Sequence, residues 1–105
     1  LITKDWDYGY RARRITEMLT AQDKLSKDDF ARVQGDTKNE FALELIGYLD
    51  KLSFTDPPVA AAVKRLAKWD GQERADSPEA ALYELFWSQL LKDTFRDELP
   101  KALWL

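Results

Sequence analysis

The side chains in this chain that could do chemistry are few, and two pairs stand out. Trp69 and Asp70 adjoin in the stretch RLAKWDG, and an indole beside a carboxylate can bind a sugar or another ligand. Asp28 and Asp29 are also adjacent, as an oxygen-ligated metal site or an acid–base pair could require. A third group consists of three arginines that could contact phosphate: Arg11, Arg13 and Arg14.

Histidine and cysteine are absent from the chain. Their absence excludes a Ser-His-Asp triad, a Cys-His pair and the commonest zinc sites. The four glycines are scattered, so they cannot form a phosphate-binding loop. The four serines are also scattered, at Ser26, Ser53, Ser77 and Ser88.

Composition is that of one globular domain. The chain has 105 residues, 45% of them hydrophobic and 33% charged. The formal net charge is −3, and basic and acidic residues are mixed along the chain, so we expect no nucleic-acid partner. No apolar run is long enough to cross a membrane, and we expect no membrane partner.

The hydrophobic spacing is helical throughout, and no stretch shows the alternation of a strand. We predict five helices, over about Tyr10–Gln22, Lys27–Gln34, Lys38–Leu52, Pro57–Trp69 and Pro78–Asp97. Ser26 and Ser77 are predicted N-caps, and Asp36 or Thr37 can cap the third helix. The predicted fold is therefore all-α, with about five helices in an irregular orthogonal bundle as a single domain over residues 1–105.

These helices give the chemical candidates a second interpretation. Asp28 and Asp29 fall in the first turn of a helix, where carboxylates complement the helix dipole. In the stretch WDG, Gly71 fits the left-handed residue after a helix, so we favour a helix end with Trp69 folded onto the core over a ligand site. The three arginines lie near Asp5, Asp7 and Glu17, which favours intramolecular ion pairs over a phosphate site.

The fifth helix is apolar around most of its circumference. Its stretch ALYELFWSQLL has eight apolar residues in eleven, and they do not form one stripe. Four short helices would not cover it, so we expect either a homodimer or a larger partner. The residues expected in that interface are Trp87, Leu91, Phe95, Leu103 and Trp104. Because the chain starts at Leu1 and ends on an apolar tail, we also expect both ends to be cut from a longer polypeptide.

Four stretches, in order, carry a family resemblance: GYRARRI, LSKDDFARVQGDTKNEFA, RLAKWDG and DSPEAALYELFW. Together they resemble the penicillin acylase family of N-terminal-nucleophile hydrolases, which cleave amide bonds of acylated substrates such as β-lactams and acyl-homoserine lactones. The resemblance runs from Asp5 to about Leu99 and corresponds to a helical part of the β subunit. It implies a segment excised from a larger α/β/β/α hydrolase, whose α subunit and β-subunit core would be its partners.

The resemblance also implies which residues are missing. Family members use the serine at the start of the β subunit as nucleophile and its own α-amine as base, and neither maps onto this chain. We therefore expect no catalytic and no cofactor-binding residue here. Asp36 matches the aspartate of the family's Q-x-D pattern, and we interpret it as a structural cap rather than a catalytic carboxylate.

Family members carry a structural calcium, and the resemblance places one of its carboxylate ligands shortly before Arg14 and Ile15. Asp5 and Asp7 are the candidates in the full protein, with the remaining oxygen ligands outside this chain. Within the chain alone, both are expected to be solvated surface aspartates, with no cofactor bound.

The main hypothesis is a non-catalytic helical domain that packs on the catalytic core of an acylase. The resemblance implies a periplasmic or secreted protein. The alternative is a free-standing helical module that binds a partner protein through its fifth helix. A helix-turn-helix DNA reader is disfavoured because positive charge is not concentrated on any helix.

Overall fold

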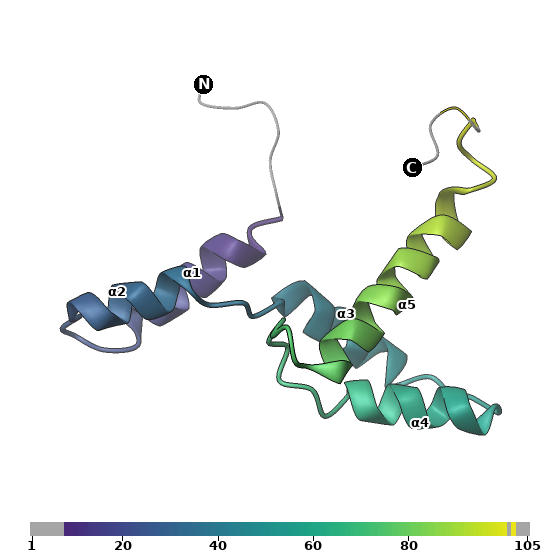
Figure 1. Ribbon diagram of the computed structural model, residues 1–105, viewed down its shortest axis with the longest axis horizontal. Coiled ribbons are helices and arrows are strands. Elements are labelled where there is room, and N and C mark those ends of the chain that lie inside the picture. The colour runs from purple at the N-terminus through teal and green to yellow at the C-terminus, as the bar shows by residue number, and fades with distance from the viewer. Residues whose placement is uncertain (1–7, 101, 103–105) are drawn as a thin grey trace.

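The computed structural model describes residues 8–100 and 102. Within these residues the chain forms five α-helices and no strand, which confirms the all-α prediction. The helices are α1 (Tyr10–Thr20), α2 (Lys27–Gln34), α3 (Glu40–Leu49), α4 (Pro57–Leu66) and α5 (Pro78–Phe95), as Figure 1 shows. None of the helices in this part of the chain is long and apolar enough to cross a membrane.

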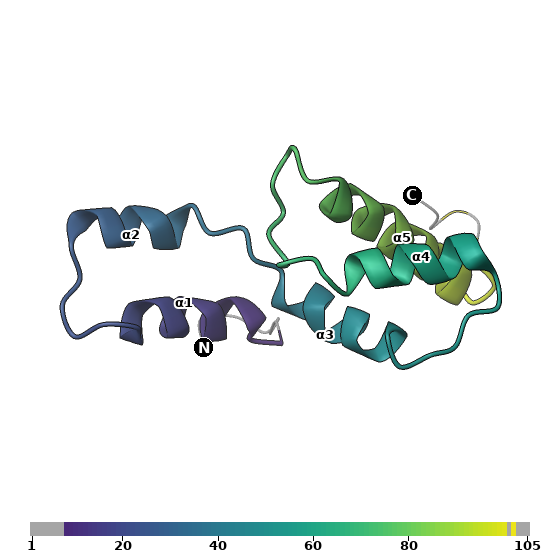
Figure 2. The same cartoon turned by 90° about the horizontal axis from the view of Figure 1, so that it is seen from below.

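The first two helices form an antiparallel hairpin (Figure 2). Ser26 caps α2 as predicted, because its hydroxyl accepts the Asp29 amide at 3.3 Å. The Asp29 carboxylate returns the contact by accepting the Ser26 amide at 2.6 Å, which completes a capping box. Asp29 is the only buried charged residue in the described part of the chain, and none of the buried hydrophobic residues comes from this hairpin.

The hydrophobic core lies in the other three helices. Its buried members come from α3, α4, α5 and the loop after α4: Ala42, Ile46, Leu66, Trp69, Ala80 and Tyr83. Contacts of α4 with both α3 and α5 hold this group together, and Figure 2 shows the three helices side by side. Pro78 opens α5 after its N-cap Ser77, whose hydroxyl accepts the Ala80 amide at 3.1 Å, as predicted.

The apolar side chains of α3 and α5 are only partly buried. In α3 the core positions are Ala42 and Ile46, whereas Phe41 is 36% exposed, and Leu52, just after the helix, is 59% exposed. In α5 Tyr83 is buried as a central core residue, but Leu85 is 72% exposed. The reason is the small number of neighbours: α3 and α4 can cover one side of α5, not its whole circumference.

The molecule is elongated. Its radius of gyration is 17.4 Å, whereas a compact domain of this length would have about 13 Å. The α1–α2 hairpin lies beside the three-helix group and contacts it through α3 (Figure 1). The C-terminal half of α5 extends beyond α3 and α4, and residues 91–100 are all exposed. The apolar side chains of Leu91 and Phe95 in the last turns of α5 are thus left exposed.

Several predicted helix ends are wrong by a few residues. The first helix ends at Thr20 instead of Gln22, and the fifth ends at Phe95 instead of Asp97. The third helix runs over Glu40–Leu49 instead of Lys38–Leu52, and its N-cap is Asn39 rather than Asp36 or Thr37. The start shifts because residues 37–39 are extended and pair with residues 71–73.

Candidate functional site

The Asp36 carboxylate joins three parts of the chain. Arg14 of α1 binds it with two hydrogen bonds, Nε to Oδ2 at 2.8 Å and Nη2 to Oδ1 at 3.0 Å. Gln72 donates to Oδ1 at 3.3 Å from the loop before α5. The Arg14 guanidinium holds the pKa of Asp36 below its usual range. Asp36 is therefore a structural anion, as predicted, although it links segments instead of capping α3.

Two short segments cross beside Asp36 and form a single antiparallel bridge. The Asn39 amide donates to the Gly71 carbonyl at 2.8 Å, and the Glu73 amide donates to the Thr37 carbonyl at 3.1 Å. The Asn39 side chain donates to Glu73 at 3.1 Å, while its own oxygen accepts the Ala42 amide at 2.9 Å and so caps α3. One residue thus fixes both the start of α3 and the loop before α5.

The stretch WDG belongs to this crossing and is not a helix end. Helix α4 already ends at Leu66, so the prediction that Gly71 follows it directly is wrong. Gly71 does have the predicted positive φ, at 78°, but its role is tertiary: a Cβ there would lie 2.8 Å from Leu43 Cδ1. A side chain at this position would push the loop away from α3.

Trp69 and Asp70 serve the same loop. Trp69 is folded onto the core as predicted, with its ring centroid 5.7 Å from that of Tyr83. Its indole donates to the Gln72 carbonyl at 3.3 Å. The exposed Asp70 carboxylate accepts from the Gln72 amide at 3.0 Å and from Arg74 at 2.7 Å. Both polar groups are engaged within their own loop, which favours the structural interpretation over a ligand site.

Two of the three arginines of α1, Arg13 and Arg14, form intramolecular ion pairs as predicted, but mostly with carboxylates that the sequence did not indicate. Arg13 donates to Glu40 at 2.9 Å, and Arg14 reaches Asp36 as well as Glu17, the latter at 3.6 Å. The other two predicted partners, at positions 5 and 7, lie outside the described residues. Long-range pairs of this kind leave no local signal, since Arg13 and Glu40 are 27 residues apart.

The adjacent aspartates Asp28 and Asp29 do not act as a pair. The pKa of Asp29 is lowered to about 2, first by the Ser26 hydroxyl and amide and then by Arg32. Asp28 is exposed in the first turn of α2, where its charge suits the helix dipole. Among residues 8–100 and 102, no three acidic side chains are close enough to hold a metal ion. Asp5 and Asp7 lie outside these residues, so the calcium site remains a prediction.

A groove of about 830 Å³ opens next to the Asp36 junction, between the α1–α2 hairpin and α3. Its wall is a row of three aromatic rings from three helices. The Tyr10 and Phe41 centroids are 5.6 Å apart, and those of Phe41 and Trp87 are 5.1 Å apart, both edge to face. Arg11, Arg14 and Asp36 are among the polar side chains around it. Among the described residues that line it, there is no nucleophile with a neighbouring base.

Comparison with known proteins identifies the family. The family model described as penicillin amidase matches residues 1–105, the whole chain. The chain belongs to the penicillin amidase family. Two similar relatives, each named acyl-homoserine lactone acylase QuiP, come from Pseudomonas syringae pathovars syringae (strain B728a) and tomato (strain ATCC BAA-871 / DC3000). Each is 30% identical over 112 residues, an alignment that covers 93% of this chain and 14% of the relative.

No solved structure matches this penicillin amidase family chain. The chain spans about a seventh of the length of the curated relatives that it matches. The match to the penicillin amidase family model confirms the family that the four sequence stretches indicated.

Proposed function

We propose that this chain is a helical part of a larger acylase that hydrolyses the amide bond of an acylated substrate of the β-lactam or acyl-homoserine lactone type. The observation that carries the proposal is the penicillin amidase match over the full chain. The two relatives, which are named as acyl-homoserine lactone acylases, support the second substrate class. Within that protein the chain is a scaffold and supplies no reacting group.

The scaffold role follows from what the polar side chains already do. Ser26 and Ser77 are held as helix caps. The Ser26 hydroxyl accepts from the Asp29 amide and donates to the carboxylate of the same residue, and the Ser77 hydroxyl accepts from the Ala80 amide. Ser53 and Ser88 are exposed, and no histidine or cysteine exists to activate them. The Asp36 carboxylate beside the groove is paired with Arg14. The family resemblance points instead to an N-terminal serine nucleophile elsewhere in the hydrolase.

The partner of this scaffold would be the catalytic body of the same hydrolase, that is, its α subunit and the core of its β subunit. Support comes from the elongated shape and from the exposed apolar residues along α5: Leu85, Leu91 and Phe95. By the same resemblance the hydrolase would be periplasmic or secreted. A free-standing module that binds a partner protein through this α5 surface is the second candidate.

The direct test uses the full-length protein that contains this chain. We expect it to release the free amine from a phenylacetylated amide or from an N-acyl-homoserine lactone, and the ratio of the two values of kcat/KM assigns the substrate class. Ser53→Ala and Ser88→Ala should leave kcat/KM unchanged. A protein that hydrolyses neither substrate would overturn the proposal and favour the interaction module.

A further inference from the structure

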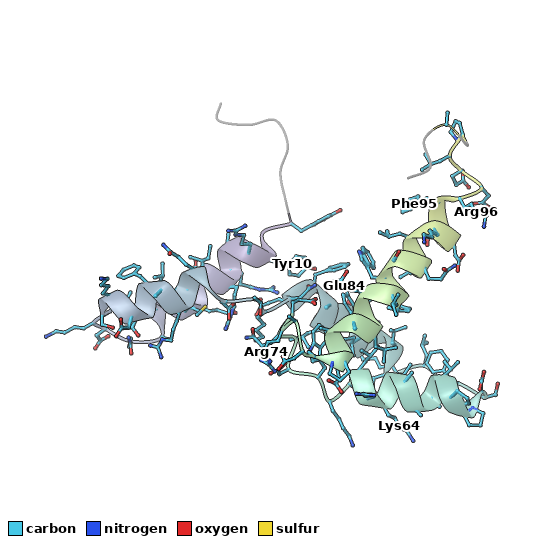
Figure 3. All side chains as sticks on the ribbon, viewed as in Figure 1. Tyr10, Lys64, Arg74, Glu84, Phe95 and Arg96 are labelled. Carbon is cyan, nitrogen blue, oxygen red and sulfur yellow. The ribbon has the colours of Figure 1, made fainter. Side chains whose placement is uncertain are left out.

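One wall of the groove beside Asp36 is formed by a row of three aromatic rings, each in contact with the next. Phe41 lies between the rings of Tyr10 and Trp87, so α1, α3 and α5 each contribute one ring. The Tyr10 hydroxyl donates to Glu44 at 2.9 Å, which fixes the outer end of the row, and Figure 3 shows Tyr10 at the junction of α1 with the three-helix group. Yet Phe41 remains 36% exposed. Ordered aromatic rings that stay accessible are typical anchors for a binding partner.

The charges around the groove are unequal. Five charged side chains line it, three of them cationic: Arg11, Arg14, Lys38, Asp36 and Glu40. Arg14 is paired with Asp36, and Lys38 lies 3.6 Å from Glu40, which also binds Arg13. Arg11 forms no ion pair with any residue in the described part of the chain. The groove thus presents apolar rings next to one positive charge that no residue among 8–100 and 102 pairs with.

We propose that this groove receives a segment of the same hydrolase from outside these 105 residues, one that places an apolar side chain against Phe41 and Trp87 and a carboxylate on Arg11. The inference rests on the proposed function and names one surface through which the scaffold docks, separate from the exposed apolar residues along α5. The relatives are about seven times as long as the matched stretch, so a segment elsewhere in the same polypeptide could occupy the groove. Covalent connection gives that segment a high effective concentration, so a small groove is enough.

A second copy of this chain fits the groove less well. A two-fold contact would bring the same surface from both copies together, including both unmatched arginines. Like charges brought together at an interface oppose association. The carboxylate therefore has to come from a different segment.

Photo-crosslinking in the full-length protein tests this. With p-benzoylphenylalanine in place of Phe41, we expect mass spectrometry to find an intramolecular link to one peptide outside this chain, with Asp or Glu beside an apolar residue. Lys64, which lies on α4 well away from Tyr10 (Figure 3), is the control position and should not link to that peptide. A link to a second copy, to residues 1–7, or to no protein segment would overturn the proposal.

Further substitutions at Met18 and Arg11 check the crosslinking result. Met18 also lines the groove, so photo-methionine at that position is a smaller change that should give the same link if position 41 tolerates no bulk. Arg11→Glu should reduce the yield of the link about tenfold, since it places two carboxylates together, and Arg11→Lys should keep most of it. An unchanged yield in Arg11→Glu would rule out the carboxylate.

Hydrolysis measured on the same samples separates this inference from the proposed function. Turnover without the link means that the enzyme assignment holds and the docking surface is wrong. The link without turnover means that the surface is right and the hydrolase assignment fails.

Discussion

Asp36 shows how much of this small fold depends on single polar residues. Its carboxylate binds Arg14 of α1 and Gln72 of the loop before α5, at 2.8 Å and 3.3 Å. The α1–α2 hairpin adds no buried hydrophobic residue to the core. Charge-assisted hydrogen bonds therefore hold the hairpin against the rest of the fold, whereas apolar burial holds the other three helices together.

Gly71 gives a sharp stability prediction at the residue scale. Its φ is 78°, and a Cβ would lie 2.8 Å from Leu43. Gly71→Ala should lower the free energy of unfolding by roughly 2–4 kcal/mol, from backbone strain together with overpacking. The matched control is Gly47→Ala in α3, where a Cβ meets no atom within 4 Å, and it should raise stability by about 0.5–1 kcal/mol. Chemical denaturation measures both; equal effects would refute the close contact.

Glu73 gives a prediction about pH. Burial raises its pKa, and the neighbouring Glu84 carboxylate acts in the same direction, against the hydrogen bond from Asn39. Because the folded-state pKa lies above the unfolded value, its contribution to stability is present at low pH and is lost as pH rises through the folded pKa. Glu73→Gln keeps an oxygen for Asn39 but cannot ionise.

We therefore expect Glu73→Gln to raise the melting temperature at pH 7 by a few degrees and to have little effect near pH 3. Thermal melts at both pH values provide the measurement. A variant that is less stable at pH 7 would show that the charged form of Glu73 is the favoured one.

At the scale of elements, the caps decide where helices begin. Ser77 accepts the Ala80 amide at 3.1 Å at the start of α5, the longest helix. Ser77→Ala should cost about 1 kcal/mol of unfolding free energy. Ser88→Ala, at an exposed position inside the same helix, should change stability by no more than about 0.5 kcal/mol, because serine there caps nothing. If the two substitutions cost the same, the cap does not stabilise α5.

Local signals were enough to place all five helices and two of their caps, because hydrophobic spacing and capping chemistry act within one or two turns. They were not enough to choose between Asp36, Thr37 and Asn39 at the start of α3, since all three side chains can cap. The choice is made by residues 71–73, more than 30 residues away along the chain, which hold residues 37–39 extended. A sequence read locally contains no trace of that pairing.

The groove illustrates the same limit for the candidate site. Tyr10, Phe41 and Trp87 come from three helices and meet only in the folded chain. Each residue was visible as an apolar position, but nothing in the sequence showed that the three rings form one row. The partner of Arg14 was hidden for the same reason, because Asp36 is 22 residues away.

At the scale of the whole molecule, the chain leaves too much apolar surface exposed for a compact monomer. Leu85, Leu91 and Phe95 are 72%, 38% and 49% exposed along α5. We expect the isolated chain to self-associate through this helix, with Trp87, Leu91 and Phe95 in the interface. Leu103 and Trp104 lie outside the described residues. Analytical ultracentrifugation over a concentration series tests this. A strict monomer that binds no hydrophobic dye would contradict it.

The central claim is that this chain is a scaffold within an amide hydrolase and not its catalytic part. The most direct measurement compares amine release from a phenylacetylated amide and an N-acyl-homoserine lactone by the 105-residue chain and by the full-length protein. We expect turnover by the full-length protein and none by the isolated chain, which has no histidine or cysteine to activate its serines and in which the Ser26 hydroxyl is held in a helix cap. Turnover by the isolated chain that is abolished by replacing Ser26, Ser53, Ser77 or Ser88 would contradict the claim.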